Sequence, residues 1–556
     1  MTGAEMAVKT LEKNGVKVVF GYPGAANCPI IDRLSFSSIK HILTRNEQGA
    51  AHMASGYSRV TKEVGVCTAT SGPGATNLIT GIATAYMDSI PMIALTGQVT
   101  TKLIGKDAFQ EVDITGATLP FTKHSYLIKD GLDIPKVINE AFYIANTGRP
   151  GPVLIDFPMD LLKQDFDYPD EDEDVNIRGY KLTGKANESQ VKKVAEAIKA
   201  SKKPVILAGG GITISDATNE LRKFIKETDI PVVSTMMGIG TLPTDHPRYY
   251  GMIGSHGVKR ANMIFNRADL VIVMGSRLGD RTVANVKGLE KDNKLIHIDI
   301  DPAEIGKNTQ PYIPVVGDIK DVLEQLIPQV SDYKANKEWI EEAEELRSRF
   351  THEPFSEDNG FVNPKYLLRV LSEKTNSDVY LSTEVGQNQI WCANNFTFTT
   401  PRSLLTSGGF GTMGYGLPAA IGASVAAEGK KPVIAVMGDG SFQMDLPEMG
   451  TMAQWDIPVK MILFKNNRLG MVHEHQYLLY KSNYQAVTIE GKPDFEMLAK
   501  AYGIESATVS ENSDVAAAID KMMAHEGSYL LIAEVSPFEP TGDALNEATL
   551  PKKEGN

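Results

Sequence analysis

Cysteine is scarce in this sequence of 556 residues. The three cysteines, Cys28, Cys67 and Cys392, form no CxxC pair and have no spacing typical of a metal site. This usage is typical of a reduced cytoplasmic protein in which each cysteine is a small, buried apolar residue. Disulfides are also not needed, because a chain of this length can bury sizeable cores without them.

Long apolar runs are also missing. No stretch approaches the roughly 20 residues of a membrane span, and short runs such as Ile90–Leu95 are typical of buried strands. The N-terminal segment has the pattern of an amphipathic helix followed by a strand, which differs from that of a signal peptide. We therefore expect a cytoplasmic protein that is not associated with a membrane.

The chain lacks a surplus of basic residues. It has 56 Lys and Arg against 69 Asp and Glu, which gives a formal net charge of −13. Nucleic-acid binding requires basic groups that neutralise phosphates, so the charge argues against that class of protein. Binding of a small anion is still allowed, because it needs only local N–H groups and a metal ion.

A short apolar strand, a glycine-rich turn and a helix recur along the chain. Examples are VKVVFGYPGAA, PVILAGGGI and KPVIAVMGDGSF. This alternation predicts an α/β fold of parallel sheets covered by helices on both faces. Ligands of such sheets bind at the carboxyl ends of the strands, where these glycines lie.

Two polar stretches interrupt the pattern, Tyr168–Ser189 and Ser331–Gly360. Such charged stretches are usually solvated linkers or domain boundaries. We therefore predict three doubly wound domains and a polar tail, at residues 1–165, 190–330, 360–540 and 541–556.

The segment Gly438-Asp439-Gly440-Ser441 follows an apolar strand and precedes a helix. Asp439 offers a carboxylate oxygen, and Asn466, at the end of the next strand, offers an amide oxygen. Mg²⁺ prefers such oxygen ligands and takes others from phosphates and water. Alone, the GDGS segment can be an ordinary turn. Together with Asn466 it resembles the GDG…NN signature of thiamine diphosphate enzymes.

Glu47 lies in the pattern RNEQGAAHMASGYSR. A lone Glu at such a place is usually a solvated residue at a helix start. In thiamine diphosphate enzymes, a Glu in this pattern hydrogen bonds the aminopyrimidine ring and promotes loss of the thiazolium C2 proton. The match predicts that Glu47 is the activating carboxylate and is largely buried.

From Met1 to about Phe538 the chain resembles the catalytic subunit of acetohydroxyacid synthases, also called acetolactate synthases. The matching strings are FGYPGAA, SGPGATN, GKDAFQE, GRPGPVLID, GSRLGDR, VGQNQIW, SGGFGTMGYGLPAAIGA, GDGSFQM and LGMV. The resemblance implies pyrimidine-binding, flavin-binding-like and pyrophosphate-binding domains, in that order. It also implies an active site between two chains, a homodimer or homotetramer, and in many members a small regulatory subunit.

The resemblance implies a role for each matching position. Mg²⁺ would be bound by Asp439, Asn466 and the backbone carbonyl of Arg468. Thiamine diphosphate would contact Val385, Gln387, Asn388, Gly411, Met413, Gly438, Gly440, Ser441, Met471 and Val472. From the partner chain, the residues facing substrate and cofactor would be Glu47, Gly24, Ala25, Phe109 and Gln110. A non-redox FAD would lie along Arg149, Gly210, Gly254, His256, Arg277, Asp280, Arg281 and Asp299.

Several of these positions have a purely structural alternative. Met413 and Phe109 are residue types that usually belong to a core. Gly210 fits any strand-to-helix turn, and the Arg277–Arg281 stretch fits an ordinary surface pair.

The sequence departs from the family pattern at four positions. His475 stands where many members have a Trp that favours 2-oxobutyrate as the second substrate, and Met159 replaces a Lys. Asn46 replaces a His, and Lys465 replaces the first Asn of the NN pair. His475 is either a polar substrate contact or a partly exposed helix residue. The departures concern the acceptor side more than the activation of the cofactor.

The expected activity is a decarboxylating condensation of two 2-oxo acids that depends on thiamine diphosphate and Mg²⁺, with FAD as a further cofactor. The expected reaction converts two pyruvate to 2-acetolactate and CO₂, a step of branched-chain amino acid biosynthesis. The alternatives within the superfamily are a pyruvate oxidase, a 2-hydroxyacyl-CoA lyase or another carboligase. An inactive cofactor-binding scaffold is a further alternative, but binding alone has less need for Glu47.

Overall fold

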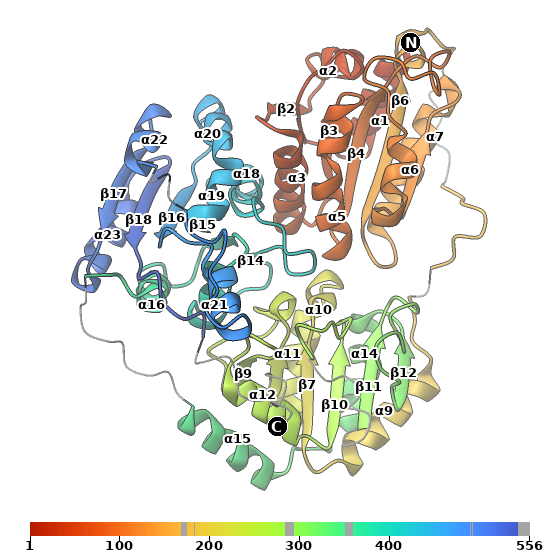
Figure 1. Cartoon of the computed structure of the whole chain (residues 1–556). Coiled ribbons are helices and arrows are strands. Elements are labelled where there is room, and N and C mark those ends of the chain that lie inside the picture. Colours follow the sequence, from red (N-terminus) through yellow and green to blue (C-terminus); the bar gives the residue numbers. More distant parts are fainter. Residues whose placement is uncertain are drawn as a thin grey trace.

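The computed structural model describes residues 1–167, 175–182, 184–283, 294–350, 360–489, 491 and 493–542. In these ranges the chain forms three parallel six-stranded sheets flanked by helices (Figure 1), which confirms the predicted α/β class. Residues 168–174 of the first expected boundary and 543–556 of the expected tail lie outside the described residues. None of the helices in the described ranges is long and apolar enough to span a membrane.

The first sheet has the strand order β2-β1-β3-β4-β6-β5. Its strands are β1 Val18–Gly21, β2 Lys40–Leu43, β3 Gly65–Ala69, β4 Met92–Gln98, β5 His124–Leu127 and β6 Pro152–Pro158. Its helices are α1 Gly3–Lys13, α2 Cys28–Leu34, α3 Glu47–Thr61, α4 Pro73–Asn77, α5 Ile79–Met87, α6 Ile114–Thr118, α7 Ile134–Asn146 and α8 Met159–Lys163. Strands β3, β4 and β6 are buried along their whole length, because helices cover both faces.

The second sheet has the strand order β12-β11-β10-β7-β8-β9. Its strands are β7 Pro204–Ala208, β8 Val232–Ser234, β9 Tyr249–Met252, β10 Leu270–Met274, β11 Lys294–Asp299 and β12 Ile313–Val316. Its helices are α9 Glu188–Ala200, α10 Gly210–Ile214, α11 Thr218–Thr228, α12 Lys259–Arg267, α14 Ile319–Leu326 and α15 Lys337–Arg349. Helix α15 lies in the second expected boundary, yet it packs on this sheet. The buried Trp339 donates its indole N–H to the carbonyl of Pro204 at 2.9 Å.

The third sheet has the strand order β14-β13-β15-β16-β18-β17. Its strands are β13 Tyr380–Thr383, β14 Leu404–Leu405, β15 Val433–Gly438, β16 Lys460–Lys465, β17 Glu505–Val509 and β18 Tyr529–Glu534. Its helices are α16 Pro364–Lys374, α17 Gln387–Asn395, α18 Gly416–Ala427, α19 Asp439–Asp445, η5 Leu446–Glu448, α20 Met449–Trp455, α21 Gly470–Leu479, α22 Phe495–Ala501 and α23 Asn512–Ala524. Each sheet lies within one predicted domain range, and the exact boundaries remain a prediction.

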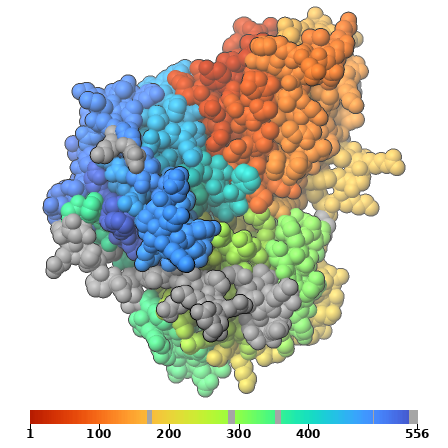
Figure 2. Space-filling view, viewed as in Figure 1, coloured from red at the N-terminus to blue at the C-terminus, as the bar shows by residue number. Residues whose placement is uncertain are grey.

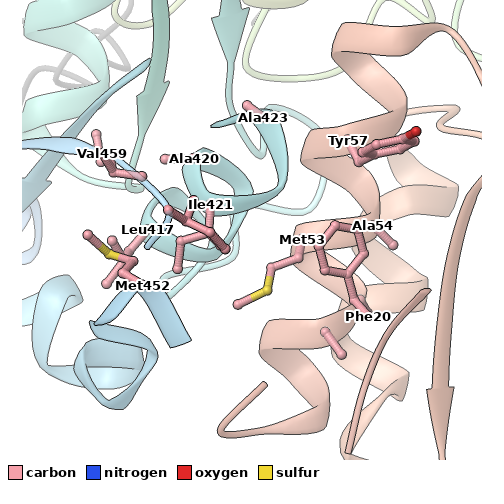
Figure 3. Packing of buried hydrophobic residues seen from close by; sticks show 14 of the residues in the cluster. Phe20, Met53, Ala54, Tyr57, Leu417, Ala420, Ile421, Ala423, Met452 and Val459 are labelled. Carbon is pink, nitrogen blue, oxygen red and sulfur yellow. The ribbon is translucent and has the colours of Figure 1, made fainter. Parts of the chain in front are cut away.

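The first and third domains share one hydrophobic core where α3 crosses α18 (Figure 3). Helix α18 is apolar on all sides, as expected for a helix buried between two layers. A Cβ atom at Gly56 would overlap the carbonyl of Ala419, and one at Gly422 would overlap that of Met53. The helices therefore touch backbone to backbone. In the space-filling view the two domains meet along a continuous seam (Figure 2).

The close contact between α3 and α18 makes Gly422 sensitive to any added side chain. We expect Gly422→Ala to lower the free energy of unfolding by about 1–3 kcal/mol, because overpacking forces the two backbones apart. The measurement is the urea unfolding midpoint at one fixed protein concentration. Gly184→Ala is the control, because nothing lies within 4 Å of the added Cβ, and it should change stability by less than about 0.5 kcal/mol. Equal effects of the two substitutions would contradict the prediction.

Candidate active site

Asp439 begins α19 directly after β15 and is 2% exposed. Its Oδ2 atom accepts the backbone N–H groups of Asn466 at 3.1 Å and Asn467 at 2.6 Å. Its Oδ1 atom has no hydrogen-bond partner among the described residues. Burial raises the pKa of Asp439 to about 6, and the N–H donors oppose this shift. A buried carboxylate oxygen without a donor fits a cation ligand.

Four other predicted diphosphate and metal residues, Gly438, Gln387, Asn388 and Asn466, lie near Asp439. Asn466 follows β16, accepts the backbone N–H of Arg468 at 3.0 Å and donates to Oε1 of Gln387 at 3.4 Å. Oδ1 of Asn388, at the start of α17, has no partner in the described chain. A Cβ at Gly438 would lie 3.4 Å from the amide nitrogen of Asn388. The carboxyl ends of β13, β15 and β16 thus bring these predicted residues together.

Glu384 is a buried carboxylate at the end of β13 that the sequence analysis did not identify. It is 0% exposed and accepts backbone N–H groups of Gly414 and Gly416 at 2.7 Å and of Leu417 at 3.3 Å. Burial raises the pKa of Glu384 to about 7 despite these donors. Glu384 therefore fixes the turn after Met413 next to Val385. Met413 itself is half-buried.

Two further buried carboxylates, Asp445 and Glu448, follow at the end of α19 and in η5. Asp445 is 5% exposed, and its Oδ2 atom has no partner within the described residues. Burial, together with the charges of Glu384 and Glu448, raises the pKa of Asp445 to about 8. The neighbouring like charges and the lack of a donor at Oδ2 within the described chain both favour the neutral form of Asp445.

Glu47 begins α3 at the carboxyl edge of the first sheet. Its Oε2 atom accepts the side-chain N–H of Asn77 at 2.9 Å. The prediction that Glu47 is largely buried is wrong for the single chain, where the side chain is half-buried. The physical reason is its place at the start of a helix on an open sheet edge, with the α4 turn on one side and solvent on the other.

The other predicted substrate-facing residues lie in loops of the first domain, after β1 and after β4. A Cβ at Gly24 would lie 2.5 Å from Thr70, and one at Gly72 would lie 2.8 Å from Gln110. Gly72 has φ +60°, so this close loop contact needs glycine. Ala25 is exposed, and Phe109 is 88% exposed. The core alternative for Phe109 is therefore wrong for the single chain.

The candidate residues form two groups, which we call half-sites, one at Glu47 in the first domain and one at Asp439 in the third. The hydrogen bond of Glu47 goes to Asn77 of its own domain, and those of Asp439 go to Asn466 and Asn467 of the third domain. Among the described residues, no hydrogen bond joins the two groups.

A cavity of about 1200 Å³ lies where the three domains meet. The predicted flavin-site residues that line it are Arg149, Gly210, His256, Arg277, Asp280, Arg281 and Asp299. Gly254 is not among the lining residues, but its neighbours Ile253 and Ser255 are. The cavity exceeds the roughly 300–1,000 Å³ of most ligand pockets, so it has room for a dinucleotide.

The alternative that the Arg277–Arg281 stretch is an ordinary surface pair applies to Arg281 but not to Arg277. Arg277 is half-buried, with Nη1 3.7 Å from the sulfur of Met87, whereas the exposed Arg281 pairs with Asp280 at 3.8 Å. Burial raises the pKa of Asp299, at the end of β11, to about 6.

Residues of the third domain line the same cavity. They are Gly411, Met471, Val472 and His475. His475 is exposed on α21, and its ring centroid lies 5.7 Å from that of Tyr480. Both alternatives for His475 therefore remain open. Met159 starts α8 and is half-buried, but it is not among the residues that line the cavity.

A buried ion pair links the first domain to the loop at residues 406–411. Arg59 and Asp88 are joined at 2.7 Å. Arg59 also donates to the carbonyl of Thr406 at 3.0 Å, and Asp88 accepts the N–H of Gly409 at 2.7 Å. Hydrogen bonds of this kind offset the cost of burying both charges. The pair holds the loop that carries Gly411.

Comparison with known protein families identifies three matching models. They are the thiamine pyrophosphate enzyme N-terminal TPP binding domain at residues 1–117, the central domain at 191–326 and the C-terminal TPP binding domain at 384–533. The matches confirm the prediction of thiamine diphosphate as cofactor. The class defined by fold and half-sites is therefore that of the thiamine pyrophosphate enzymes.

Individual relatives narrow this class. A probable acetolactate synthase large subunit of Methanocaldococcus jannaschii is 44% identical over 99% of this chain and 95% of its own. The acetolactate synthase large subunit of Corynebacterium glutamicum is 43% identical over 94% and 84%. The isozyme 3 large subunit of Escherichia coli is 39% identical over 100% and 99%. The chain belongs to the acetolactate synthase large-subunit family.

The raised pKa of Asp445 predicts how stability depends on pH. The folded state keeps a proton at Asp445 up to a pKa of about 8, whereas the ordinary value is 3.8. The folded state therefore binds more protons in this window, and Asp445 lowers stability as pH rises through it. Asp445→Asn removes this titration. Its Tm relative to the unchanged chain should rise from about pH 4 to about pH 8 and change little above that.

The exposed carboxylate Asp456 provides the control substitution, Asp456→Asn. Thermal unfolding of the three proteins across the pH series is the measurement. A Tm difference for Asp445→Asn that stays constant or shrinks with rising pH would contradict the prediction.

Proposed function

We propose that this chain condenses two pyruvate molecules to 2-acetolactate with release of CO₂. The observation that carries the proposal is the buried Oδ1 atom of Asp439, which lacks a donor and lies beside Asn466 at the joined ends of β15 and β16. The donor set suits Mg²⁺, with one carboxylate, one amide oxygen and the carbonyl of Arg468. The large-subunit relatives, each named an acetolactate synthase, support the choice of reaction.

Thiamine diphosphate supplies the carbon nucleophile and the electron sink when bound. Gln387, Asn388 and Ser441 bind its diphosphate, and Val385, Gly411 and Met413 seat its ring. When the cofactor is bound, Glu47 would hydrogen bond its aminopyrimidine ring and would favour proton loss from it. The half-burial of Glu47 and the exposed Phe109 support a second chain over this edge. We therefore propose a homodimer, in which each Glu47 serves the third domain of its partner.

The cavity where the domains meet is proposed to hold a non-redox FAD. Its volume and the glycine turn at the end of β7 support a dinucleotide. Arg149 stands at its wall in ion pairs with Glu304 at 2.7 Å and Asp301 at 3.3 Å. The relatives are named large subunits, and we extend to this chain their implied pairing with a small regulatory subunit. A cytoplasmic location remains a prediction.

The purified chain, given pyruvate, thiamine diphosphate, Mg²⁺ and FAD, should release CO₂ and form acetolactate. Glu47→Gln should lower kcat by roughly 100-fold or more, because it removes the carboxylate that promotes proton loss. Product analysis and steady-state rates are the measurements. Bleaching of bound FAD by pyruvate with peroxide formation would instead identify a pyruvate oxidase. Full turnover in Glu47→Gln would refute the role of Glu47.

The polar wall at His475 predicts a weak preference for 2-oxobutyrate over pyruvate as acceptor. His475→Trp should raise that preference by about tenfold or more, because one methylene in an apolar pocket is worth 10–200-fold. Competition between the two 2-oxo acids measures it. Tyr477→Trp is the control, because Tyr477 is exposed on the same helix but is not among the cavity-lining residues. An unchanged product ratio in His475→Trp would remove His475 from the acceptor pocket.

A further inference from the structure

Glu448 is a fully buried carboxylate of the third domain that hydrogen bonds the first domain. It lies in η5 and is 0% exposed. Its Oε1 atom accepts the backbone N–H groups of Arg45 and Asn46, both at 3.0 Å, and Oε2 accepts that of Arg45 at 3.1 Å. The hydroxyl of Thr451 donates to Oε2 at 2.6 Å. Both carboxylate oxygens are therefore held by donors.

The two backbone donors immediately precede Glu47 in the chain. Asn46 is the residue before the first helical residue of α3, so the backbone turn that Glu448 holds is the turn from which Glu47 projects. A Cβ at Gly49 would overlap Oε1 of Glu448, so the first turn of α3 lies directly against this carboxylate. The guanidinium of Arg45 also donates to the carbonyl of Gly450 at 2.9 Å and to Gln454 at 2.8 Å.

The contact depends on the charge and on the acceptor atoms of the Glu448 carboxylate. Burial raises the pKa of Glu448, whereas the donors Thr451, Arg45 and Asn46 favour its charged form. The start of a helix also favours a negative charge. Removing the carboxylate would leave two buried backbone N–H groups without acceptors. Because unpaired buried N–H groups are costly, the start of the helix would shift to find other acceptors. A shift of the turn at residues 45–46 would turn Glu47 with it.

We propose that Glu448 is a positioning residue that sets the orientation of Glu47 from the third domain of the same chain. The proposal rests on the role proposed above for Glu47. The segment at residues 439–448 begins at the candidate metal ligand Asp439 and ends at Glu448. It therefore joins the third-domain half-site of the chain to the backbone that carries Glu47.

Glu448→Gln tests the proposal, because a side-chain amide of the same size has one acceptor oxygen where the carboxylate has two. The backbone amides of Arg45 and Asn46 should exchange with deuterium about five- to tenfold faster. Proton exchange at the thiazolium C2 of bound thiamine diphosphate, without substrate, should slow roughly 10- to 100-fold, and kcat should fall equally. The KM for pyruvate and the Kd for the cofactor should stay within about threefold.

Two further variants complete the test. Asp269 also accepts two backbone N–H groups, those of Lys202 at 2.9 Å and Lys203 at 3.0 Å, in the central domain. Asp269→Asn is therefore the matched control, and it should leave C2 exchange and kcat unchanged. Thr451→Val removes one donor to Glu448 and should give a smaller effect of the same kind. Thr451→Val replaces Glu448→Gln as the test variant if Glu448→Gln does not fold.

The outcomes separate this inference from the proposed function. Unchanged C2 exchange and kcat in Glu448→Gln, with Glu47→Gln inactive, would overturn the positioning role alone. A fall in kcat explained entirely by weaker cofactor binding, with normal C2 exchange in the saturated enzyme, would also overturn it. Full turnover in Glu47→Gln would refute the proposed function first.

Discussion

The backbone contact between α3 and α18 is the constraint on which the rest of the structure depends. Gly56 and Gly422 let the two helices meet without intervening side chains, so the first and third domains share one core and cannot rotate independently. The contact therefore fixes the positions of both ends of α3. Its start carries Glu47 at the open edge of the first sheet, and near its end Arg59 pairs with Asp88 and holds the loop before Met413.

The seam between these domains contains carboxylates where apolar packing would suffice for stability. Glu384 and Glu448 are each fully buried, and each binds several N–H groups of a turn beside a predicted site residue. Buried charges contribute little to stability, but they define the local structure, because only one arrangement satisfies all of their donors. Asp445 lies near both, and its Oδ2 atom has no donor among the described residues, so its pKa is raised and its neutral form is favoured.

The sequence predicted the sheets and the joined half-site at Asp439, because those depend on local patterns. Asp439 and Asn466 each follow an apolar run, and parallel strands place such ends side by side. The burial of a residue between two domains has no signature in the local sequence. Glu448 in the string LPEMGT looks like an ordinary solvated helix residue, and Glu384 precedes VGQN like any strand-end polar residue. The sequence signal that could have identified Glu384 is a charged residue at a strand end, directly before the matched string VGQNQIW.

The same reasoning applies to the burial of Glu47 and Phe109. A motif indicates that Glu47 touches a cofactor and that Phe109 faces a substrate, but it does not indicate which chain covers them. In the single chain Glu47 is half-buried and Phe109 is 88% exposed. Phe109 is an exposed apolar ring on a loop next to Gly72, and the proposed second chain would bury apolar area by covering it. Because α18 already occupies one face of α3, the proposed second chain would approach Glu47 and Phe109 from a side that α18 leaves open.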